Sequence, residues 1–313
     1  MNLQQLRYAA EIARRGLNVS EAAVALHTSQ PGVSRQVRAL EEELGVEIFR
    51  RQGKRFVAVT DAGREVLAGI DRVLSEIAGL KAIGEEHAHE GRGHLTVAVT
   101  HTQARYALPK VVTAFKRRFP EVRLKLLQGS PHQLAKLVIG GEADLAIATE
   151  ALAGYPELVS IPGYQWHHVV VVPAGHALAK THPLTLEAVA KYPVVTYDPS
   201  FTGRSAIDKS FEQRDLAPEI ALTALDSDVI KAYVALGLGV GIVSSMAVAR
   251  AKEEGLEALD AAHLFPTQVT RLAFKRGAYL RGFTVEFVRL FSPHTTPEGL
   301  KRLAEGGAAD FDI

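Results

Sequence analysis

Residues 18–45 constrain the fold more than any other stretch, because they carry the pattern of two short helices joined by a tight turn. The second helix is expected to begin at Thr28 or Ser29, which are good N-caps. Pro31 suits its first turn, where a backbone N–H would have no partner, and Gly45 is expected to end it. One apolar stripe at spacings of four, three and four comprises Val33, Val37, Leu40 and Leu44.

The polar residues at the start of the second helix lie off this apolar stripe. They are Ser29, Gln30, Ser34, Arg35 and Arg38. A helix that presents such side chains from its first turns is typical of a recognition helix in the major groove of double-stranded DNA. A helical hairpin with a solvated polar face is the alternative, and the helix pair alone does not decide between the two.

A basic hairpin is predicted directly after the helix pair. Short apolar runs at 48–49 and 56–59 flank Gln52-Gly53, which is typical of a β-hairpin. Its cations are Arg50, Arg51, Lys54 and Arg55. Residues 1–60 contain nine Lys or Arg and six Asp or Glu, whereas residues 61–90 contain three and seven. The positive charge is therefore placed where a wing would contact phosphate or the minor groove.

The segment SQPGVSRQVRALEEELGVEIFRR, residues 29–51, resembles the signature region of LysR-type transcriptional regulators. The resemblance implies that residues 1–60 form a winged helix-turn-helix domain that binds promoter or operator DNA. It also implies self-association as a dimer or homotetramer, and contact with RNA polymerase.

A long helix is predicted over residues 61–86, with Thr60 as its cap. Its apolar seam alternates by four and three residues and comprises Val66, Ile70, Val73, Ile77 and Leu80. This pattern favours a dimer interface over a surface helix of one domain, and the family resemblance implies the same. Residues 87–93 follow as a polar hinge. His87 and His89 lack a third ligand type there, so no metal site is expected.

Residues 94–292 alternate strands and helices, which predicts doubly wound α/β structure with ligands at the carboxyl ends of parallel strands. We expect one lobe from 94–161 and 267–292, a second lobe from 162–266, and a mobile tail over 293–313. The fold class is therefore multidomain. An α-helical winged helix-turn-helix domain and a linker helix precede a two-lobed α/β effector domain of the periplasmic-binding-protein type, which the LysR resemblance also implies.

Polar residues follow several strand ends that this topology brings to one cleft. Hydroxyl and amide groups beside helix starts can form an anion site together with the N-terminal N–H groups. The candidate ligand-binding residues are Thr100, Thr102, Gln103, Glu150, Trp166 and Thr202. Each polar residue could instead be a helix cap, and Trp166 could be a core residue. The convergence of several such groups favours a ligand site.

Four segments narrow the resemblance to the CysB-type branch of the LysR family, whose members regulate sulfur assimilation and cysteine biosynthesis. They are VTHTQARYALPKVV at 99–112, ATE at 148–150, YQWHH at 164–168 and YDPSFTGRS at 197–205. The resemblance implies that the six residues above bind sulfate, thiosulfate, O-acetylserine or N-acetylserine. Glu150 would repel a bare sulfate, so it either pairs with an ammonium group or shapes the pocket edge. The alternative effector is a different small acid, either an aromatic acid or an acid that signals nitrogen status, because a fold does not determine which ligand it binds.

The composition and motifs exclude several classes of protein. The chain has no cysteine, which excludes disulfides, thiolate metal sites and thiol redox sensing. MNLQQLRYAAEIARRG lacks a signal-peptide pattern and no run of about 18 apolar residues occurs, so a cytoplasmic protein without membrane contact is expected. No nucleophile–base motif is present, so we expect no enzyme activity, no catalytic residue, no metal and no cofactor beyond the small-molecule effector.

Overall fold

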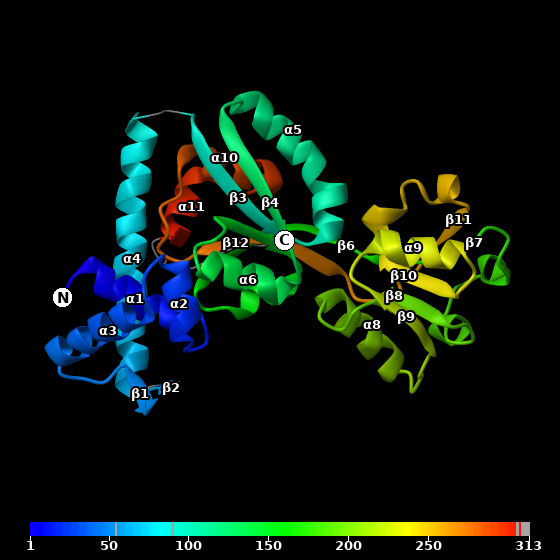
Figure 1. The fold of residues 1–313 in the computed structure, drawn as a ribbon. Coiled ribbons are helices and arrows are strands. Elements are labelled where there is room, and N and C mark those ends of the chain that lie inside the picture. Colours follow the sequence, from blue (N-terminus) through cyan, green and yellow to red (C-terminus); the bar gives the residue numbers. More distant parts are fainter. Residues whose placement is uncertain (54, 89–90, 305–306, 308–313) are drawn as a thin grey trace. The chain divides into compact units, whose positions relative to one another are not determined.

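The computed structural model forms two compact units and describes residues 1–53, 55–88, 91–304 and 307 (Figure 1). The first unit contains residues 1–88 with 277–279, and the second contains residues 89–276 with 280–313. Within the described residues, no helix combines the length and the apolar character needed to cross a membrane.

The first unit is a helical domain with a two-stranded hairpin and a long final helix. Its elements are α1 (Leu3–Arg14), α2 (Val19–Ala25), α3 (Gln30–Leu44), β1 (Phe49–Gln52), β2 (Arg55–Val59) and α4 (Asp61–Ala88). Ser29 is the N-cap of α3, and Gly45 ends that helix in the left-handed conformation with φ of 69°, as predicted. Val33, Val37 and Leu40 are fully buried, but Leu44 is 38% exposed. Leu44 lies in the last turn of α3, beyond the part of the stripe that the core covers.

Helix α4 begins where the sequence indicates, because the Thr60 hydroxyl accepts a hydrogen bond from the Gly63 N–H at 2.8 Å. Its predicted seam is only partly covered within the single chain. Ile70 is buried in the core of the first unit, whereas Val73 and Leu80 are 44% and 68% exposed. The outer part of the seam is therefore an apolar strip without a partner from the described residues of this chain.

The second unit has two lobes, each built on a five-stranded sheet. The first sheet has the order β4-β3-β5-β12-β6. Its strands are β3 (Gly93–Val99), β4 (Val122–Gln128), β5 (Leu145–Ala148), β6 (Leu158–Trp166) and β12 (Gln268–Lys275). β3 pairs in parallel with β4 and β5, as predicted, whereas β12 runs antiparallel to β5 and β6. The chain thus returns to the first lobe after building the second.

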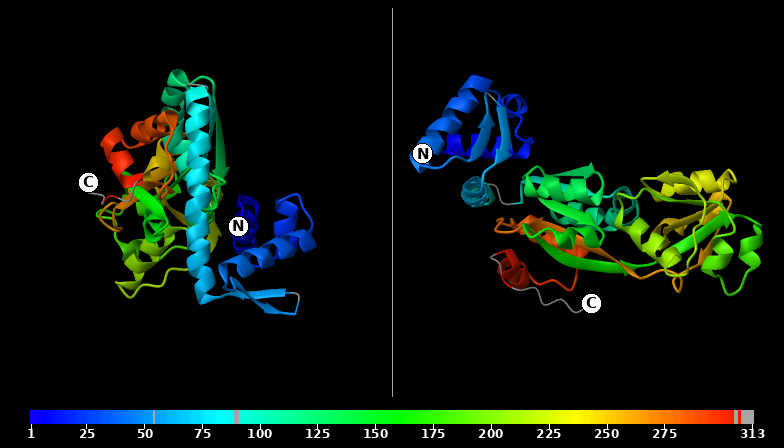
Figure 2. Two further views of the ribbon diagram at one scale, coloured as in Figure 1. Left: turned by 90° about the vertical axis from the view of Figure 1, so that its left-hand side faces the viewer. Right: turned by 90° about the horizontal axis from the view of Figure 1, so that it is seen from below.

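Helices cover both faces of the first sheet (Figures 1 and 2). One face packs against α5 (Leu108–Arg118), α10 (Gly282–Phe291) and α11 (Pro297–Ala304), and the other packs against α6 (Pro131–Ile139). Strand β6 stays in this sheet as far as Trp166, which pairs with Gln268 of β12. The first lobe therefore extends past the boundary expected at residue 161, because β12 pairs with β6 along its whole length.

The second sheet has the order β11-β7-β10-β8-β9. Its strands are β7 (His168–Pro173), β8 (Val194–Tyr197), β9 (Ile220–Ala224), β10 (Val240–Ser244) and β11 (Leu256–Asp260). The helices of this lobe are α7 (Leu186–Val189), α8 (Thr202–Glu212) and α9 (Ser227–Ala235). β8 pairs in parallel with β9 and β10, so the turns that lead into α8 and α9 lie at the same edge of the sheet.

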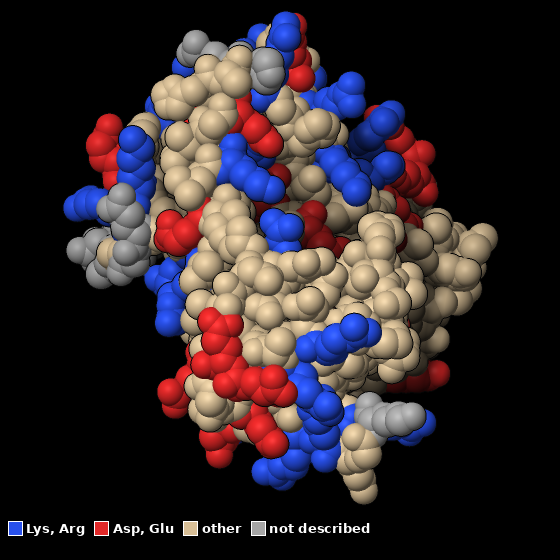
Figure 3. Space-filling model, turned by 60° about the vertical axis from the view of Figure 1, so that its left-hand side comes forward, with Lys and Arg blue, Asp and Glu red and all other residues tan. Residues whose placement is uncertain are grey.

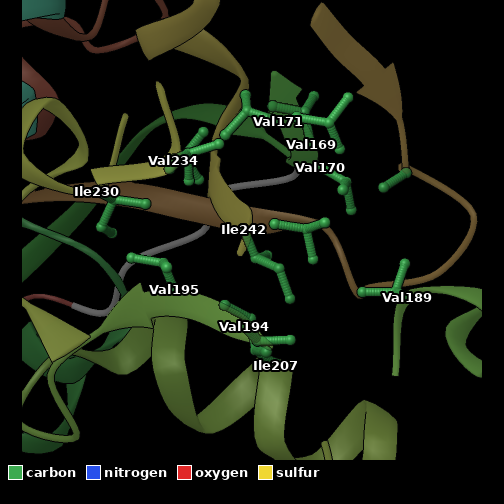
Figure 4. Packing of buried hydrophobic residues seen from close by; sticks show 14 of the residues in the cluster. Val169, Val170, Val171, Val189, Val194, Val195, Ile207, Ile230, Val234 and Ile242 are labelled. Atoms are coloured by element: carbon green, nitrogen blue, oxygen red, sulfur yellow. The ribbon is translucent and has the colours of Figure 1, made fainter. Parts of the chain in front are cut away.

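Buried valine and isoleucine side chains fill the second lobe (Figure 4). Ile207 of α8 packs on one face of the sheet, and Ile230 and Val234 of α9 pack on the other. Gly241 of β10 allows α9 to approach, because a Cβ there would lie 2.8 Å from a Val234 methyl group of that helix. Gly241 is thus explained by packing, whereas Gly237, four residues earlier, has a positive φ of 82° and open space around it.

The segment after residue 293 differs from the mobile tail that we expected. Residues 297–304 form α11, whose Leu300 and Leu303 are buried in the core of the first lobe. The Pro/Gly/acid content of the tail concealed this short amphipathic helix, which is stabilised by packing and not by its own length. Residues 305–306 and 308–313 lie outside the described residues.

Candidate functional site

The side chains predicted to read DNA are presented by α3. Gln30, Arg35 and Arg38 are exposed, and Ser34 is half-buried. The Ser29 hydroxyl accepts a hydrogen bond from a backbone N–H of the first turn at 3.4 Å, so it has a structural role as a cap. On the face drawn in Figure 3, Lys and Arg form separate groups with Asp and Glu among them, in keeping with a formal net charge of +1. Base contact by the α3 side chains stays a prediction.

Arg51 of the wing is engaged inside the domain. It forms an ion pair with the buried Glu41 of α3, and its guanidinium carbon lies 4.7 Å from the centre of the Phe56 ring. Glu41 also accepts hydrogen bonds from the backbone N–H groups of Ile48 and Phe49 at 2.9 and 3.1 Å. Arg51 and Glu41 therefore join the wing to α3, a role that differs from the phosphate contact predicted for Arg51.

The other wing cations that the structure describes lie on the hairpin, as predicted. Arg50 and Arg55 are exposed on β1 and β2, and Lys54 lies outside the described residues. The sequence did contain a signal for Glu41, because Glu41 follows Val37 by four residues and so lies on the buried stripe of α3.

Thr100, Thr102 and Gln103 lie where β3 leads into a π-helical turn, Gln103–Ala107, and then into α5. Such turns are rare and frequently occur at functional sites. Thr100 is buried, and its N–H donates to the Ile147 carbonyl of β5 at 3.3 Å. These three residues therefore occupy the carboxyl end of β3, as the predicted topology requires.

The side-chain amide of Gln103 is already satisfied within the first lobe. Its Nε2 donates to the Thr270 hydroxyl at 3.0 Å, and its Oε1 accepts a hydrogen bond from the Tyr164 hydroxyl. Gln103 is 3% exposed, and burial raises the pKa of Tyr164 to about 12, so that hydroxyl keeps its proton. Gln103 thus holds the π-helical turn in place, and its amide is a less available ligand group than the sequence suggests.

A chain of hydroxyl groups connects the two lobes. The Thr102 hydroxyl lies 3.4 Å from the Ser227 hydroxyl at the start of α9, and Ser227 lies 2.6 Å from the Tyr197 hydroxyl. Tyr197 in turn accepts a hydrogen bond from the Ser244 N–H at 2.9 Å. Burial raises the pKa of Tyr197 to about 12. A ligand that takes the Thr102 hydroxyl would therefore compete with an interlobe contact.

The start of α8 is an uncapped helix N-terminus beside two buried rings. Its N-cap residue is Phe201, whose side chain cannot accept a hydrogen bond from the helix, so the N-cap position offers no side-chain acceptor to the first N–H groups. A Cβ on Gly203 would lie 3.3 Å from His168 Nε2 and 3.7 Å from the Trp166 ring. The Trp166 and His168 ring centres are 5.0 Å apart. N–H groups at a helix start favour an anion.

Several buried polar atoms of this region have no hydrogen-bond partner, and those of Trp166 and His168 belong to the rings beside this helix start. Among the described residues they include Trp166 Nε1, both ring nitrogens of His168, and the hydroxyls of Thr196 and Ser244. Burial, and secondarily the neighbouring His167, lowers the pKa of His168 to about 4, so the ring is neutral near pH 7. Unpaired buried polar groups are costly and call for a partner. The sequence identified Trp166 but not the contribution of His168.

Glu150 and Thr202 complete the predicted ligand set. Glu150 begins a 3-10 turn directly after β5, and Thr202 is the first residue of α8, so both follow strand ends as expected. Their side chains lie outside what the structure describes. Their contacts with a ligand therefore stay predictions.

A charged cluster, here called the Lys231 network, bridges the lobes on the α9 side. It comprises Arg105, Tyr106, Asp228, Lys231 and Glu254. Asp228 pairs with Arg105 at 2.7 Å and with Lys231 at 3.3 Å, and it accepts a hydrogen bond from Tyr106. Lys231 is 3% exposed and lies 2.9 Å from Glu254. Burial alone would lower the pKa of Lys231, but its hydrogen bonds to Glu254 and Tyr106 outweigh burial and raise that pKa.

One group of described side chains has the composition of a cation site. Ligand atoms of His101, Asp226 and Asp228 lie within 4.8 Å of one another. Asp226 is already the N-cap of α9, and Asp228 already neutralises Arg105 and Lys231. Two cations beside the same carboxylate oppose a divalent ion, so the chemistry of the donor set does not suit a metal.

Two family descriptions match the chain. Residues 3–64 match the bacterial regulatory helix-turn-helix protein of the lysR family, and residues 88–295 match the LysR substrate binding domain. The chain is 50% identical to the HTH-type transcriptional regulator CysB of Burkholderia cenocepacia, over 100% of both chains. It is 46% identical to the HTH-type transcriptional regulator cbl of Escherichia coli, over 96% of both chains.

A solved structure resembles the second unit. It is the crystal structure of the cofactor-binding domain of the Cbl transcriptional regulator, which is 46% identical in sequence, with a TM-score of 0.67. The match covers 70% of this chain and 96% of that chain.

Proposed function

The chain belongs to the LysR family of DNA-binding transcriptional regulators, and from this premise we propose that it controls sulfur assimilation and cysteine biosynthesis genes in response to a small effector. The relatives and both matched families are regulators, so the protein is not an enzyme. The sulfur assignment is supported by relatives named CysB and Cbl. It agrees with the resemblance carried by residues 99–112, 148–150, 164–168 and 197–205.

The first unit would read DNA with the exposed side chains of α3, while the wing grips the backbone. Gln30, Arg35 and Arg38 have the donor groups that contact base edges in the major groove. Arg50 and Arg55 are placed on the wing for phosphate. We propose that the protein acts in the cytoplasm as a dimer or tetramer on promoter DNA, where it contacts RNA polymerase.

The effector would lie between the end of β3 and the start of α8. The observation that carries this proposal is the uncapped N-terminus of α8, with the unpartnered Trp166 Nε1 and His168 ring beside it. From the first lobe, Thr100 and Thr102 at the end of β3 would supply hydroxyl groups. A helix N-terminus, an indole N–H and hydroxyl groups are donors for a sulfate or carboxylate oxygen.

The neutral His168 ring offers one donor and one acceptor nitrogen, which bears on the choice between effectors. Near pH 7, sulfate and thiosulfate accept hydrogen bonds but donate none, so they leave the acceptor nitrogen of His168 without a partner. N-acetylserine carries an amide N–H and a hydroxyl, and O-acetylserine carries an ammonium group that Glu150 could pair with. An acetylserine therefore satisfies more of the proposed site than a bare anion does.

Calorimetric titration of the full-length protein with sulfate, thiosulfate, O-acetylserine and N-acetylserine tests the proposal. We expect at least one of them to bind, and Thr102→Ala to weaken that binding while operator affinity stays unchanged. If none binds and an aromatic or nitrogen-status acid binds tightly instead, the sulfur assignment is wrong. Loss of DNA binding in the Thr102→Ala variant would mean that Thr102 is only structural.

A further inference from the structure

A cavity lies between the lobes, on the side of α9. It has a volume of about 560 Å³ and is lined by residues of both lobes. His101 and Arg105 come from the first lobe, and Asp226, Asp228, Lys231 and Glu254 come from the second. Three acidic and two basic side chains therefore line one small cavity, together with a histidine.

The helix that opens onto this cavity differs from α8 in one decisive respect. Asp226 caps α9, and its Oδ1 accepts hydrogen bonds from the N–H groups of Asp228 and Val229, both at 2.9 Å. The start of α9 thus already has its negative charge, whereas the start of α8 has none. The two helix starts at the same edge of the sheet therefore select ligand groups of opposite charge.

His101 adds an acceptor next to the Asp226 carboxylate. Its Nδ1 is buried and has no hydrogen-bond partner among the described residues, and it lies 3.9 Å from Asp226 Oδ1. That separation is too long for a hydrogen bond, and Oδ1 already accepts two backbone N–H groups, so a donor placed beside His101 Nδ1 would use the second carboxylate oxygen of Asp226. An ammonium group has three such donors and a positive charge that Asp226 would stabilise.

Arg105 supplies the complementary group on the other side of the cavity. Its Nε lies 2.7 Å from Asp228, and its side chain is 57% exposed. A guanidinium has five N–H donors, and the contacts with Asp228 and Tyr106 occupy only part of them. The remaining donors suit a carboxylate.

We propose that this cavity binds a free α-amino acid as a zwitterion, with its ammonium group on His101 and Asp226 and its carboxylate on Arg105. A simple anion would meet the carboxylates of Asp226, Asp228 and Glu254. A divalent cation would meet Arg105 and Lys231. Only a ligand with both charges satisfies the cavity, and its two ends would join residues of different lobes.

The ligand would act beside the proposed effector site and not in it. Thr100 and Thr102 alternate along the chain with His101, so the same turn serves both sites. The amino acid would stabilise the arrangement in which Arg105 meets Asp228, because it adds an interlobe contact to the Lys231 network. This inference needs the lobes and their cavity, but it does not depend on which anion occupies the first site.

The test uses full-length protein saturated with sulfate, titrated calorimetrically with each of the proteinogenic L-amino acids in turn. We expect one or more to bind without displacing sulfate. The N-acetyl derivative of the best ligand, which lacks the ammonium group, should bind at least about tenfold more weakly, since a charge-assisted hydrogen bond is lost.

Two variants test the two ends of the ligand. Asp226→Asn keeps a good N-cap but removes the charge, and Arg105→Gln removes the carboxylate donors. Each should weaken amino-acid binding by about tenfold or more. Asp226→Asn should leave sulfate affinity unchanged, whereas Arg105→Gln also removes the interlobe pair with Asp228 and is therefore compared with the wild type only for amino-acid binding. Lys209→Gln, an exposed site on α8 outside this cavity, is the matched control and should change neither affinity.

Three results would overturn the proposal: no amino acid binds, amino acid and sulfate compete for one site, or both cavity variants retain wild-type amino-acid affinity. Displacement of the amino acid by Mg²⁺ or Mn²⁺ would identify a cation site instead. If sulfate does not bind the wild-type protein, the result counts against sulfate as the effector in the proposed function and not against the amino-acid site. The amino-acid titration is then carried out without sulfate.

Discussion

Arg51 illustrates how far residue type and position can predict a contact. The sequence correctly places it on a basic wing, but its guanidinium is taken up by Glu41 and the Phe56 ring. The sequence could not show this pairing, because it depends on how the wing folds back on the end of α3. Glu41, which holds two backbone N–H groups as well, is the residue that sets this geometry.

The Arg51→Ala and Arg55→Ala variants should therefore weaken DNA binding in different ways. Arg55→Ala removes an exposed cation, so the slope of log affinity against log salt concentration should fall by about 1. Arg51→Ala leaves the buried Glu41 without its partner. It should lower the stability of the first unit by roughly 1–3 kcal/mol and keep the salt slope.

Fluorescence anisotropy with operator DNA over a range of salt concentrations measures both slopes, and urea unfolding measures stability. If Arg51→Ala has a normal unfolding midpoint and a reduced salt slope, Arg51 contacts phosphate, as the sequence predicted. Glu41→Gln is the matched variant from the other side of the pair and should resemble Arg51→Ala.

His168 should make the stability of the second unit depend on pH. Its pKa in the folded protein is about 4, below the ordinary value of 6.5, so between these pH values the unfolded chain binds a proton that the folded chain does not. Stability contributed by the neutral ring is complete above pH 6.5 and is lost as pH falls toward 4. The loss is at most about 1.4 kcal/mol per pH unit.

His168→Phe should remove this contribution while keeping the ring packing against Trp166 and Phe265. Urea unfolding followed at pH 7 and pH 5 should show a smaller pH effect in the variant than in the wild type. Equal pH effects in the two proteins would mean that His168 is protonated in the folded state. His176→Phe is a control at a histidine whose ring also packs against an aromatic side chain, Tyr192.

At the scale of elements, strand-to-helix turns were predictable but their capping was not. The sequence marks Ser200 to Gly203 and Asp226-Ser227 as equivalent polar turns before helices. The structure distinguishes them, because Asp226 caps α9 whereas α8 begins after Phe201 without a side-chain cap. If a helix starts one residue earlier or later, a different residue becomes its N-cap. Sequence patterns place helix boundaries less precisely than one residue, so they cannot identify the cap.

The Lys231 network should set how readily the lobes close on an effector. Lys231→Met removes the buried ammonium group and leaves Asp228 and Glu254 facing each other without it. The arrangement in which the π-helical turn meets α9 should be destabilised, and effector affinity should fall by roughly tenfold.

Calorimetric titration of the Lys231→Met variant with the effector found for the wild type checks this. Lys252→Met, at an exposed lysine in the 3-10 turn Ala251–Glu254 of the same lobe, should bind normally. Unchanged affinity in Lys231→Met would show that the network is neutral with respect to lobe closure.

At the scale of the whole molecule, the order of domains followed from periodicity, and the connections did not. The helix pair, the wing, the long helix and the alternating strands and helices all have local patterns, and the predicted fold class is confirmed. The extent of β6 and the docking of α11 depend on pairing with distant segments, β12 and the core of the first lobe. Such tertiary contacts leave little trace in short stretches of sequence.

The exposed seam of α4 leads to the prediction that belongs to the assembled protein. Val73 and Leu80 remain 44% and 68% exposed although they continue the apolar repeat of Ile70. We expect a second copy of α4 to cover them. Leu80→Glu would place a charge in that interface and should dissociate the oligomer, which light scattering or analytical ultracentrifugation would detect as a smaller mass.

Dissociation should also weaken operator binding by about a hundredfold or more. In a dimer, binding of one DNA-binding domain to its half-site makes binding of the second domain intramolecular, which raises the overall affinity. A monomer lacks this increase in affinity. Glu76→Gln, a charge change within α4 but off the apolar repeat, is the control and should keep both mass and affinity. An unchanged mass in Leu80→Glu would place the dimer interface elsewhere. A smaller mass with unchanged operator affinity would mean that one reading domain suffices for recognition.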